Sequence, residues 1–544
     1  MKSIVLGIYR RHAFALLAVG ILLTLHALGL LAPHQAGLAG LAIGAISFAN
    51  IPANVRVPLF YAEMDASQAS YFVQAKRALL VGQKLAAGTQ AVNTPVLVAT
   101  TDQAIALFGR GSMLARMHAV YRAQDLFGEV WCMAVADNGA GVAASGTITV
   151  SGPATAAGTI SLYIGGQRVQ VAVGSTDSAN TIAASINAAI NAATDLPVTS
   201  TVASAVVTVT CRWKGLTGND ITILDSFAGL PGGESLPTGV GLAYSAATLA
   251  SGTTAPTLTS GAIAALGDDE YDYIIHPYTD TTSLDALDAE LNDTTGRWSW
   301  LRQVYGHAYT ALRGTLSSLT TAGGLRNGPH HTIAGIDADC PNPSWEYASA
   351  YGARNAAFLN VDVARPTQTG VLTGILAPRA GKKFVQTERQ SLLSYGIATS
   401  YVRSGQVFIE RAITTYQKNA FGQADPSYLD SETLHTSAYV IRYLRSIITT
   451  KYPRHKLAND GTRFGGGQAI VTPNVIKGEL AAAYAQMESD GIVERADLFR
   501  KYLIVERNAN DPNRLDVLFP PDYVNQLRVF AVLNQFRLQY QAAA

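Results

Sequence analysis

The hydrophobic pattern alternates between two periods along residues 71–136 and again along residues 257–440. Short apolar runs, typical of buried strands, are followed by stretches in which apolar residues recur at helical spacing. Residues 96–99 form such a run, and Thr101 after it suits a helix N-cap. Ser283 begins a second expected helix after a similar run. Alternation of strands and helices predicts a sheet with largely parallel strands in both segments.

Further elements are expected in the second of these segments. Ser404 and Gly405 suit the turn of a hairpin, because apolar strands lie on either side of them. The other expected elements are strands at 271–276 and 332–335 and helices at 312–320 and 345–359. Together the two segments are predicted to build one α/β core that the intervening chain interrupts.

Residues 137–256, between those segments, have a different pattern. Gly-, Ala- and Ser-rich linkers surround runs of β-branched residues, which favour strands. The expected strands are 147–150, 159–164, 169–173 and 202–209. A single helix is expected at 178–193, where Ile182, Ile186 and Ile190 repeat at four-residue spacing. The pattern predicts an inserted β-rich domain.

Residues 441–528 are expected to form a C-terminal α+β domain. Thr472 and Pro473 mark a helix start, because proline suits the first helical position, and this helix is expected to end near Asp490. The strands expected after it are 498–505, 514–519 and 524–540. The whole chain is thus predicted to be an α/β and α+β multidomain protein.

An apolar, β-patterned arm is expected at each end of this body, at residues 45–70 and 529–544. Apolar residues alternate around Pro58 in the first arm, and proline favours an edge strand or an extended arm over a sheet centre. A strand without a local partner needs one from elsewhere, so both arms are predicted to make assembly contacts. The candidate interface residues are Ile46, Phe48, Ile51, Val55, Val57, Leu59, Tyr61, Val529, Phe530, Val532, Phe536, Leu538 and Tyr540.

Residues 1–44 form an apolar leader. Lys2, Arg10 and Arg11 precede the apolar run 13–32, which is the pattern of a signal anchor or a long signal peptide. The alternative is a dispensable stretch translated from an upstream start codon, and this is the favoured interpretation. Contact with a membrane is expected only if the leader is genuine.

Composition excludes several classes of protein. A chain of 544 residues has room for about two to four domains. Its 40 basic and 39 acidic residues leave a net charge of +1, so direct nucleic-acid binding is not expected. The cysteines, Cys132, Cys211 and Cys340, are too far apart for a disulfide framework or a metal pair and are expected to be buried thiols.

The chain offers only weak candidates for chemistry. His330 and His331 precede two aspartates and Cys340, which are residue types that bind metals. Neighbouring residues of a strand face opposite sides, however, so a polar loop is favoured. His307 could be a general base, but a packed histidine at a strand end is favoured. Residues 109–112 lack the lysine of a phosphate loop and are expected to form a turn between helices.

No serine-protease triad pattern and no Gly-x-Ser-x-Gly motif is present in the sequence. We therefore expect no catalytic residue, no cofactor and no metal site.

Several separated segments, in order along the chain, are similar to one known family. These segments are 46–52, 56–58, 108–114, 271–277, 341–351 and 511–529. In them the chain resembles the contractile tail sheath proteins of Mu-like bacteriophages. Together the segments cover the chain from about residue 45 to the C-terminal end, and the leader departs from the family pattern.

That resemblance implies a subtilisin-like α/β sheath core, interrupted by the inserted β-rich domain and followed by the C-terminal domain and extended terminal arms. It implies a structural subunit that polymerises as stacked hexameric rings around a tail tube and contracts to drive the tube through the host envelope during genome delivery. The implied partners are other copies of the chain, the tail tube protein, and baseplate and tail terminator proteins. The implied location is the tail sheath of the virion, after assembly in the cytoplasm of the bacterial host.

Two alternatives remain open at this point. One is a secreted or membrane-anchored surface or adhesion protein that uses the β-rich insertion as a binding module. The other is an enzyme with a site near His307 and His330.

Overall fold

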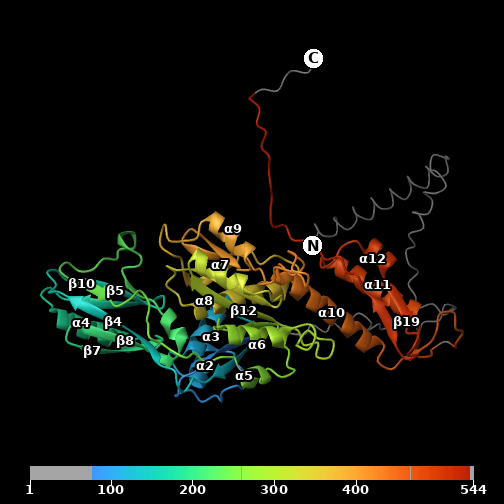
Figure 1. Cartoon of the computed structure of the whole chain (residues 1–544), viewed down its shortest axis with the longest axis horizontal. Coiled ribbons are helices and arrows are strands. Elements are labelled where there is room, and N and C mark those ends of the chain that lie inside the picture. Colours follow the sequence, from blue (N-terminus) through green and yellow to red (C-terminus); the bar gives the residue numbers. More distant parts are fainter. Residues whose placement is uncertain (1–75, 259, 466, 539–544) are drawn as a thin grey trace, which may run out of the picture. The chain divides into compact units, whose positions relative to one another are not determined.

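A computed structural model describes residues 76–258, 260–465 and 467–538 (Figure 1). The leader, the arm at 45–70 and Tyr540 lie outside the described residues. Across the described ranges, no helix is both long enough and apolar enough to span a membrane.

A six-stranded sheet forms the centre of the protein, in the order β13-β12-β11-β1-β3-β2. Its strands are β1 (Arg77–Gln83), β2 (Val96–Leu97), β3 (Glu129–Val135), β11 (Tyr273–Ile275), β12 (His307–Gly314) and β13 (His331–Asp337). All neighbours pair in parallel except β2, which is antiparallel to β3. The prediction of largely parallel strands is confirmed, and the segments before and after the insertion share one sheet because β1 pairs with β11.

Strand alternation sends side chains to two apolar layers. Leu80 of β1 joins a cluster with the helices α3 (Met113–Gln124) and α8 (Ser344–Val361). Leu79 and Val81 belong to a second cluster, with α5 (Ser260–Ala264) and α6 (Thr281–Leu291). Because successive residues of a strand face opposite sides, helices cover both faces of this sheet.

Several predicted boundaries in the core are wrong by a few residues. Thr100, not Thr101, caps α2 (Thr101–Phe108), and its side chain accepts a hydrogen bond from the Gln103 amide. Asp280 caps α6, so the helix expected from Ser283 begins two residues earlier. The helix expected at 312–320 is α7 (Leu316–Gly324), because β12 runs on to Gly314 in register with β13.

The hairpin expected at Ser404 and Gly405 is confirmed. It joins β15 (Thr399–Arg403) to β16 (Gln406–Arg411), and both turn residues have positive φ, 49° and 75°. Positive φ at both central residues is the geometry of the tight turn that suits a twisted hairpin. This hairpin and β14 (Val371–Leu376) form a three-stranded sheet, and α9 (Gln386–Ser394) lies between β14 and β15 in sequence.

The insertion consists of a four-stranded and a three-stranded sheet, in the orders β10-β4-β8-β7 and β6-β5-β9. The strands are β4 (Ala143–Ser151), β5 (Gly158–Ile164), β6 (Gln167–Val173), β7 (Val198–Ala203), β8 (Val206–Lys214), β9 (Ile223–Asp225) and β10 (Gly241–Tyr244). The predicted helix is confirmed as α4 (Ala179–Ala192), which contacts strands of both sheets. The strand expected at 202–209 is wrong, because Ser204 turns the chain with φ 53° and separates β7 from β8.

The insertion shares its apolar core with the central sheet. Trp213 of β8 meets Trp345 of α8 edge to face, with ring centroids 5.5 Å apart, and both rings are buried. Arg313 of β12 donates to the Asp220 carboxylate at 2.6 Å. One continuous cluster of buried apolar residues contains strands of the insertion and of the core.

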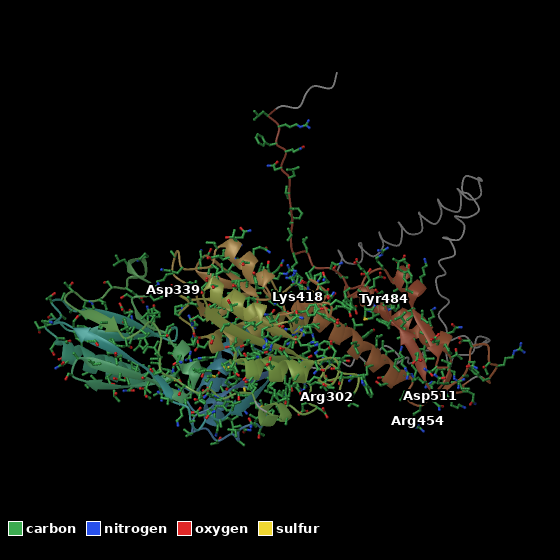
Figure 2. The ribbon with its side chains drawn as sticks, viewed as in Figure 1. Arg302, Asp339, Lys418, Arg454, Tyr484 and Asp511 are labelled. Atoms are coloured by element: carbon green, nitrogen blue, oxygen red, sulfur yellow. The ribbon has the colours of Figure 1, made fainter. Side chains whose placement is uncertain are left out.

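The C-terminal region begins with α10 (Ser431–Lys451), which runs across the expected boundary between residues 440 and 441. It continues through β17 (Lys456–Leu457), β18 (Ile470–Val471), α11 (Pro473–Ser489), α12 (Ala496–Tyr502), β19 (Ile504–Arg507) and β20 (Leu515–Leu518). The start of α11 is confirmed: Thr472 caps it and Pro473 is its first residue. Tyr484, labelled in Figure 2, stacks on Phe499 with centroids 3.7 Å apart and donates its hydroxyl to the Glu494 carbonyl at 2.7 Å.

Two strand predictions in this region are wrong. Residues 498–505 were expected to be one strand, but α12 occupies most of that stretch and β19 starts only at Ile504. The strand expected at 524–540 is absent over its described part, 524–538. A β-patterned sequence forms a strand only where a partner supplies the hydrogen bonds, and these residues have no strand beside them in the described part of the chain.

Candidate assembly interface

The root of the C-terminal arm is held against the C-terminal region by backbone hydrogen bonds. The Glu494 amide donates to the Asp522 carbonyl at 2.8 Å, and the Val524 amide donates to the Ile492 carbonyl at 3.2 Å. The Asp522 amide also donates to the Tyr484 hydroxyl at 3.0 Å. Further contacts fasten residues 526–528, and Arg528 makes ion pairs to Asp430 and Glu432.

Beyond Arg528 the chain is an extended and exposed apolar segment (Figure 1). The five predicted interface residues that the structure describes here are all exposed: Val529, Phe530, Val532, Phe536 and Leu538, with exposed fractions between 68% and 97%. Leu533, on the opposite parity from Phe530, Val532, Phe536 and Leu538 and missed by the sequence argument, is also exposed. Contact between water and this much apolar surface is unfavourable, so binding of a partner that covers the surface is favoured.

A second incomplete element lies in the same region. β19 and β20 pair only with each other in the part of the chain that the structure describes. Ile504 and Leu518 face each other across the pair, and each is about half exposed (49% and 58%). A two-stranded hairpin is marginally stable alone, and its open edges carry unpaired backbone donors and acceptors. This hairpin is therefore suited to receive an added strand.

The sequence argument placed Ile504 and Leu518 in the expected strands 498–505 and 514–519, but it named interface candidates only in the two arms and so missed both residues. Residues 504–507, with two apolar residues followed by two charged ones, show no alternation that could have marked this strand. Arg528, Asp430 and Glu432 gave no local signal, since Arg528 and Asp430 are 98 residues apart in the chain.

The histidines that suggested metal chemistry have other partners. The Nε2–H of His330 donates to the Asp293 carboxylate at 2.9 Å, and the His330 ring stacks on Trp298. His331 contacts Nε2 of His276 through its own Nε2 at 3.0 Å. His331 is the first residue of β13, so the expected polar loop ends one residue before it. No group of three metal-binding side chains is gathered in the described ranges.

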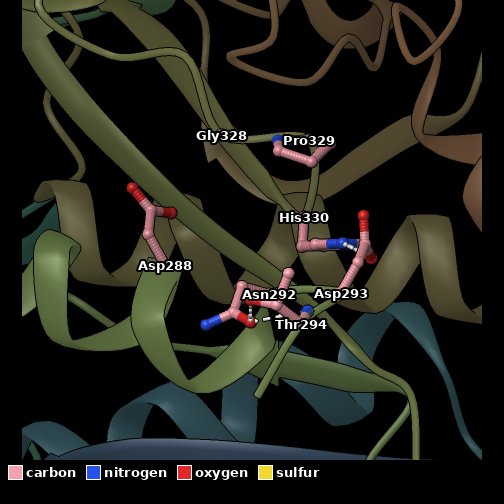
Figure 3. A pocket seen from close by; sticks show the side chains of 7 residues that line it. All are labelled: Asp288, Asn292, Asp293, Thr294, Gly328, Pro329 and His330. Atoms are coloured by element: carbon pink, nitrogen blue, oxygen red, sulfur yellow. Dashed lines mark hydrogen bonds and ion pairs between the residues drawn. The ribbon is translucent and has the colours of Figure 1, made fainter. Parts of the chain in front are cut away.

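A small hollow of about 230 Å³ lies beside these histidines (Figure 3). Its lining residues are Asp288, Asn292, Asp293, Thr294, Gly328, Pro329 and His330. The polar groups at its rim already bond to one another: Asn292 accepts from the amides of Thr294, Thr295 and Gly296, and Asp293 faces His330. Such a rim offers a ligand few free groups.

His307 is fully buried at the start of β12 and bonds to the Thr332 hydroxyl at 2.8 Å. Burial, together with the neighbouring histidines, lowers the pKa of His307 well below its usual value. A buried imidazole without access to solvent is a packed residue, which was the favoured interpretation.

The three cysteines are free and buried. Burial raises the pKa of Cys211 and of Cys340 to about 12, so both stay protonated thiols at neutral pH. The expectation of buried thiols without a disulfide framework is confirmed.

Comparisons with known proteins agree on one family. Three family models match successive parts of the chain: the phage tail sheath protein beta-sandwich domain at residues 139–245, the phage tail sheath protein central domain at 251–415 and the phage tail sheath C-terminal domain at 423–537. The Mu-like prophage FluMu tail sheath protein of Haemophilus influenzae is 41% identical over 496 residues, which cover 91% of this chain and 100% of that protein.

Solved structures give weaker likenesses. A sheath tail protein from Desulfitobacterium hafniense shares 11% identity with a TM-score of 0.46, over 87% of this chain and 97% of that one. A chain from the anti-feeding prophage baseplate in its contracted state shares 12% identity with a TM-score of 0.44, over 89% of this chain and 100% of that one.

The identity to the Haemophilus protein extends over that protein's whole length, and the three matched domains follow one another in sheath order. The resemblance inferred from the sequence is confirmed, as are a mixed α/β multidomain architecture and a structural, non-enzymatic role, and the match at residues 139–245 identifies the predicted β-rich insertion as a β-sandwich domain. The chain belongs to the phage tail sheath protein family and is a structural component of a phage tail.

Proposed function

We propose that the protein polymerises as stacked hexameric rings around the tail tube and contracts to drive the tube through the host envelope. The observation that carries this proposal is that one subunit contains two elements that each lack a β-strand partner. One is the exposed apolar arm after Arg528, and the other is the two-stranded β19–β20 hairpin with open edges. The arm is a β-patterned segment without a partner strand, and the hairpin has edges to which a strand can be added.

The arm of one subunit adds a strand to the β19–β20 hairpin of a neighbour. Backbone hydrogen bonds supply the link, and the exposed side chains of the arm cover the apolar pair Ile504 and Leu518. The arm at 45–70 acts in the same way, through Ile46, Phe48, Ile51, Val55, Val57, Leu59 and Tyr61. At the other end, the interface includes Val529, Phe530, Val532, Phe536, Leu538 and Tyr540.

Links of this kind suit a sheath that changes shape. Backbone hydrogen bonds between an extended arm and a hairpin do not fix the angle between two subunits, so the bonds persist while the subunits rotate. The extended sheath stores energy at assembly, and relaxation to a shorter, wider state drives the tube without nucleotide hydrolysis. The core is proposed to be subtilisin-like, which the parallel sheet with helices on both faces supports.

The partners are other copies of this chain, the tail tube protein, and the baseplate and tail terminator proteins, and assembly takes place in the host cytoplasm. Membership of the sheath family supports each of these partners. A surface or adhesion protein and an enzyme, the two alternatives, receive no support from the family.

The test is a chain that ends at Arg528. We expect the full chain to form striated tubes or stacked rings in negative-stain electron microscopy as its concentration rises. The shortened chain is expected to keep its far-ultraviolet circular dichroism and its melting temperature but to stay monomeric in sedimentation, because the side chains of residues 529–538 are exposed. Tubes formed by the shortened chain at the same concentration would refute the role of the arm. Unfolding of the shortened chain would place the arm in the subunit's own core.

A further inference from the structure

We propose that residues 526–528 are a clasp that fastens the root of the C-terminal arm to the start of α10 and to the segment after α8. A pull on the arm then reaches the central sheet through α10. This inference rests on the proposed function of the arm in linking subunits.

The path of the chain is the first argument. Residues 522–524 leave the C-terminal region while still hydrogen-bonded to residues 492–494. The Gln526 side chain then donates to the Ala364 carbonyl at 3.0 Å. The Gln368 side chain donates to the Leu527 carbonyl at 3.3 Å and accepts from Arg528 at 3.3 Å. The chain therefore crosses onto residues that follow α8 before the arm begins.

The charges at Arg528 are the second argument. Its guanidinium lies 3.0 Å from the Glu432 carboxylate and 3.2 Å from the Asp430 carboxylate. Glu432 is fully buried, and the Arg528 side chain is 11% exposed. Thr367 donates to Glu432 from its amide at 3.0 Å and from its hydroxyl at 2.9 Å. A buried carboxylate requires a charged or donating partner, so Arg528 is held firmly in place.

Asp430, the N-cap of α10, also joins this helix to β16 of the three-stranded sheet. Arg411, the last residue of β16, forms a two-pronged ion pair with Asp430 at 2.8 and 2.9 Å. The Ser431 amide donates to the Ala412 carbonyl at 3.0 Å. The two guanidinium groups and the two carboxylates alternate, so the cluster is neutral and charge-paired.

The helix beyond this cluster is bound to the parallel strands. His435 lies one turn after Glu432, and its Nε2 is 3.0 Å from the Tyr309 hydroxyl of β12. Arg442, further along α10, forms an ion pair with Asp272, which also accepts from the Arg77 amide at the start of β1 at 3.0 Å. Force on Arg528 is thus transmitted through the first turns of α10 to β1 and β12.

The clasp also fixes where the arm starts. Without it, residues 525–528 gain backbone freedom, and the addition of the arm to a neighbour has to remove that freedom again. We therefore expect Arg528→Met to raise the critical concentration for tube formation about tenfold, which corresponds to about 1.4 kcal/mol per subunit. Arg528→Lys is expected to restore part of the loss, because lysine keeps the charge but lacks the second guanidinium nitrogen, which donates to Gln368.

The matched control is Arg411→Met. This variant removes the other guanidinium from Asp430 but touches none of residues 526–528. We expect its critical concentration to stay near that of the wild type, even where its melting temperature falls as much as that of Arg528→Met. Gln368→Ala is a second probe that leaves no buried charge unpaired. It removes two bonds to the clasp and is expected to raise the critical concentration by a smaller factor.

Amide hydrogen exchange gives a readout that general destabilisation does not mimic. Loss of protection at the Val524 amide and at nearby amides is expected in Arg528→Met and not in Arg411→Met. Equal critical concentrations for these two variants would overturn the clasp while leaving the role of the arm intact. Normal tubes from the chain that ends at Arg528 would overturn both, because the clasp would then have no linking arm to hold.

Discussion

The central sheet and the β19–β20 hairpin differ in how far the subunit itself buries their side chains and covers their edges. In β1, six of seven residues are buried, and helices cover both faces of its sheet. In β19 no residue is fully buried, and the hairpin has open edges among the described residues. The sheet satisfies its hydrogen bonds and apolar surface within the subunit. The hairpin and the arm leave backbone hydrogen-bonding groups unpaired and apolar side chains exposed. Part of the protein's stability is therefore expected to arise only when subunits assemble.

The same chemical change at the two places tests this contrast most directly. Leu80→Ala opens a cavity in the buried core and is expected to lower the free energy of unfolding by about 2–5 kcal/mol. Leu518→Ala removes the same atoms from an exposed site and is expected to change it by less than about 0.5 kcal/mol. Urea unfolding below the assembly concentration, followed by the fluorescence of the buried Trp213 and Trp345, measures both. Equal losses for the two variants would remove the contrast.

A proline in the arm tests whether its backbone, and not only its side chains, forms the link. Val532→Pro removes an amide donor and is expected to raise the critical concentration for tubes about a hundredfold if that amide bonds to the hairpin. Val532→Thr keeps the donor and the β-branched shape and serves as the control. Both monomers should melt at the wild-type temperature, because Val532 is exposed. Tubes that form equally well from both variants would mean that this amide is unpaired.

Mild acid is expected to weaken the packing of α10 on the central sheet, because His435 of α10 is buried beside Tyr309 of β12. Burial first, and then the charge of Lys76, lower the pKa of His435 to about 3. An unfolded histidine titrates near 6.5, so the unfolded chain binds the proton first and stability falls as the pH drops below about 6.5. Between pH 7 and pH 5 the wild type is expected to lose about 2 kcal/mol more than His435→Gln, which cannot titrate there. Urea unfolding at the two pH values measures the difference, and equal losses would show that His435 does not contribute.

The smallest effect concerns the hairpin in the assembly. Leu518→Ala, nearly silent in the monomer, is expected to raise the critical concentration for tubes about threefold, because the arm loses apolar contact on the hairpin face. Sedimentation of wild-type and variant protein over a concentration series gives this ratio. Glu506→Ala, on the paired strand β19 but at a charged position, is the control and should have a smaller effect.

Much of the core could be predicted because its signals are local. Apolar runs followed by helical periodicity gave the parallel strands, and Thr472 with Pro473 gave the start of α11. Boundaries failed where tertiary pairing decided them: β12 extends to Gly314 because β13 pairs with it that far. The turn at Ser204 was not predicted, because serine is a weaker turn signal than glycine and its positive φ is seen only in the structure.

The arm could be predicted as unpartnered, but its attachment could not. Alternating apolar residues after Arg528 indicate a strand that lacks a partner, and the structure places five of them in solvent. The ion pairs of Arg528 join positions that only the folded chain brings together, and no property of the residues near Arg528 marks Glu432 as the partner.

The shared core of the insertion and the sheet has a practical consequence for protein engineering. Excision of residues 137–256 to make a smaller subunit would uncover Trp345, and the loss of Asp220 would leave Arg313 without its carboxylate. Additions are better placed in the loop at Leu230, which is exposed; nearby Gly233 has open space around it, but its φ of 73° requires that the glycine itself be kept. A foreign peptide for display should therefore be inserted into a loop of the β-sandwich and should not replace the domain.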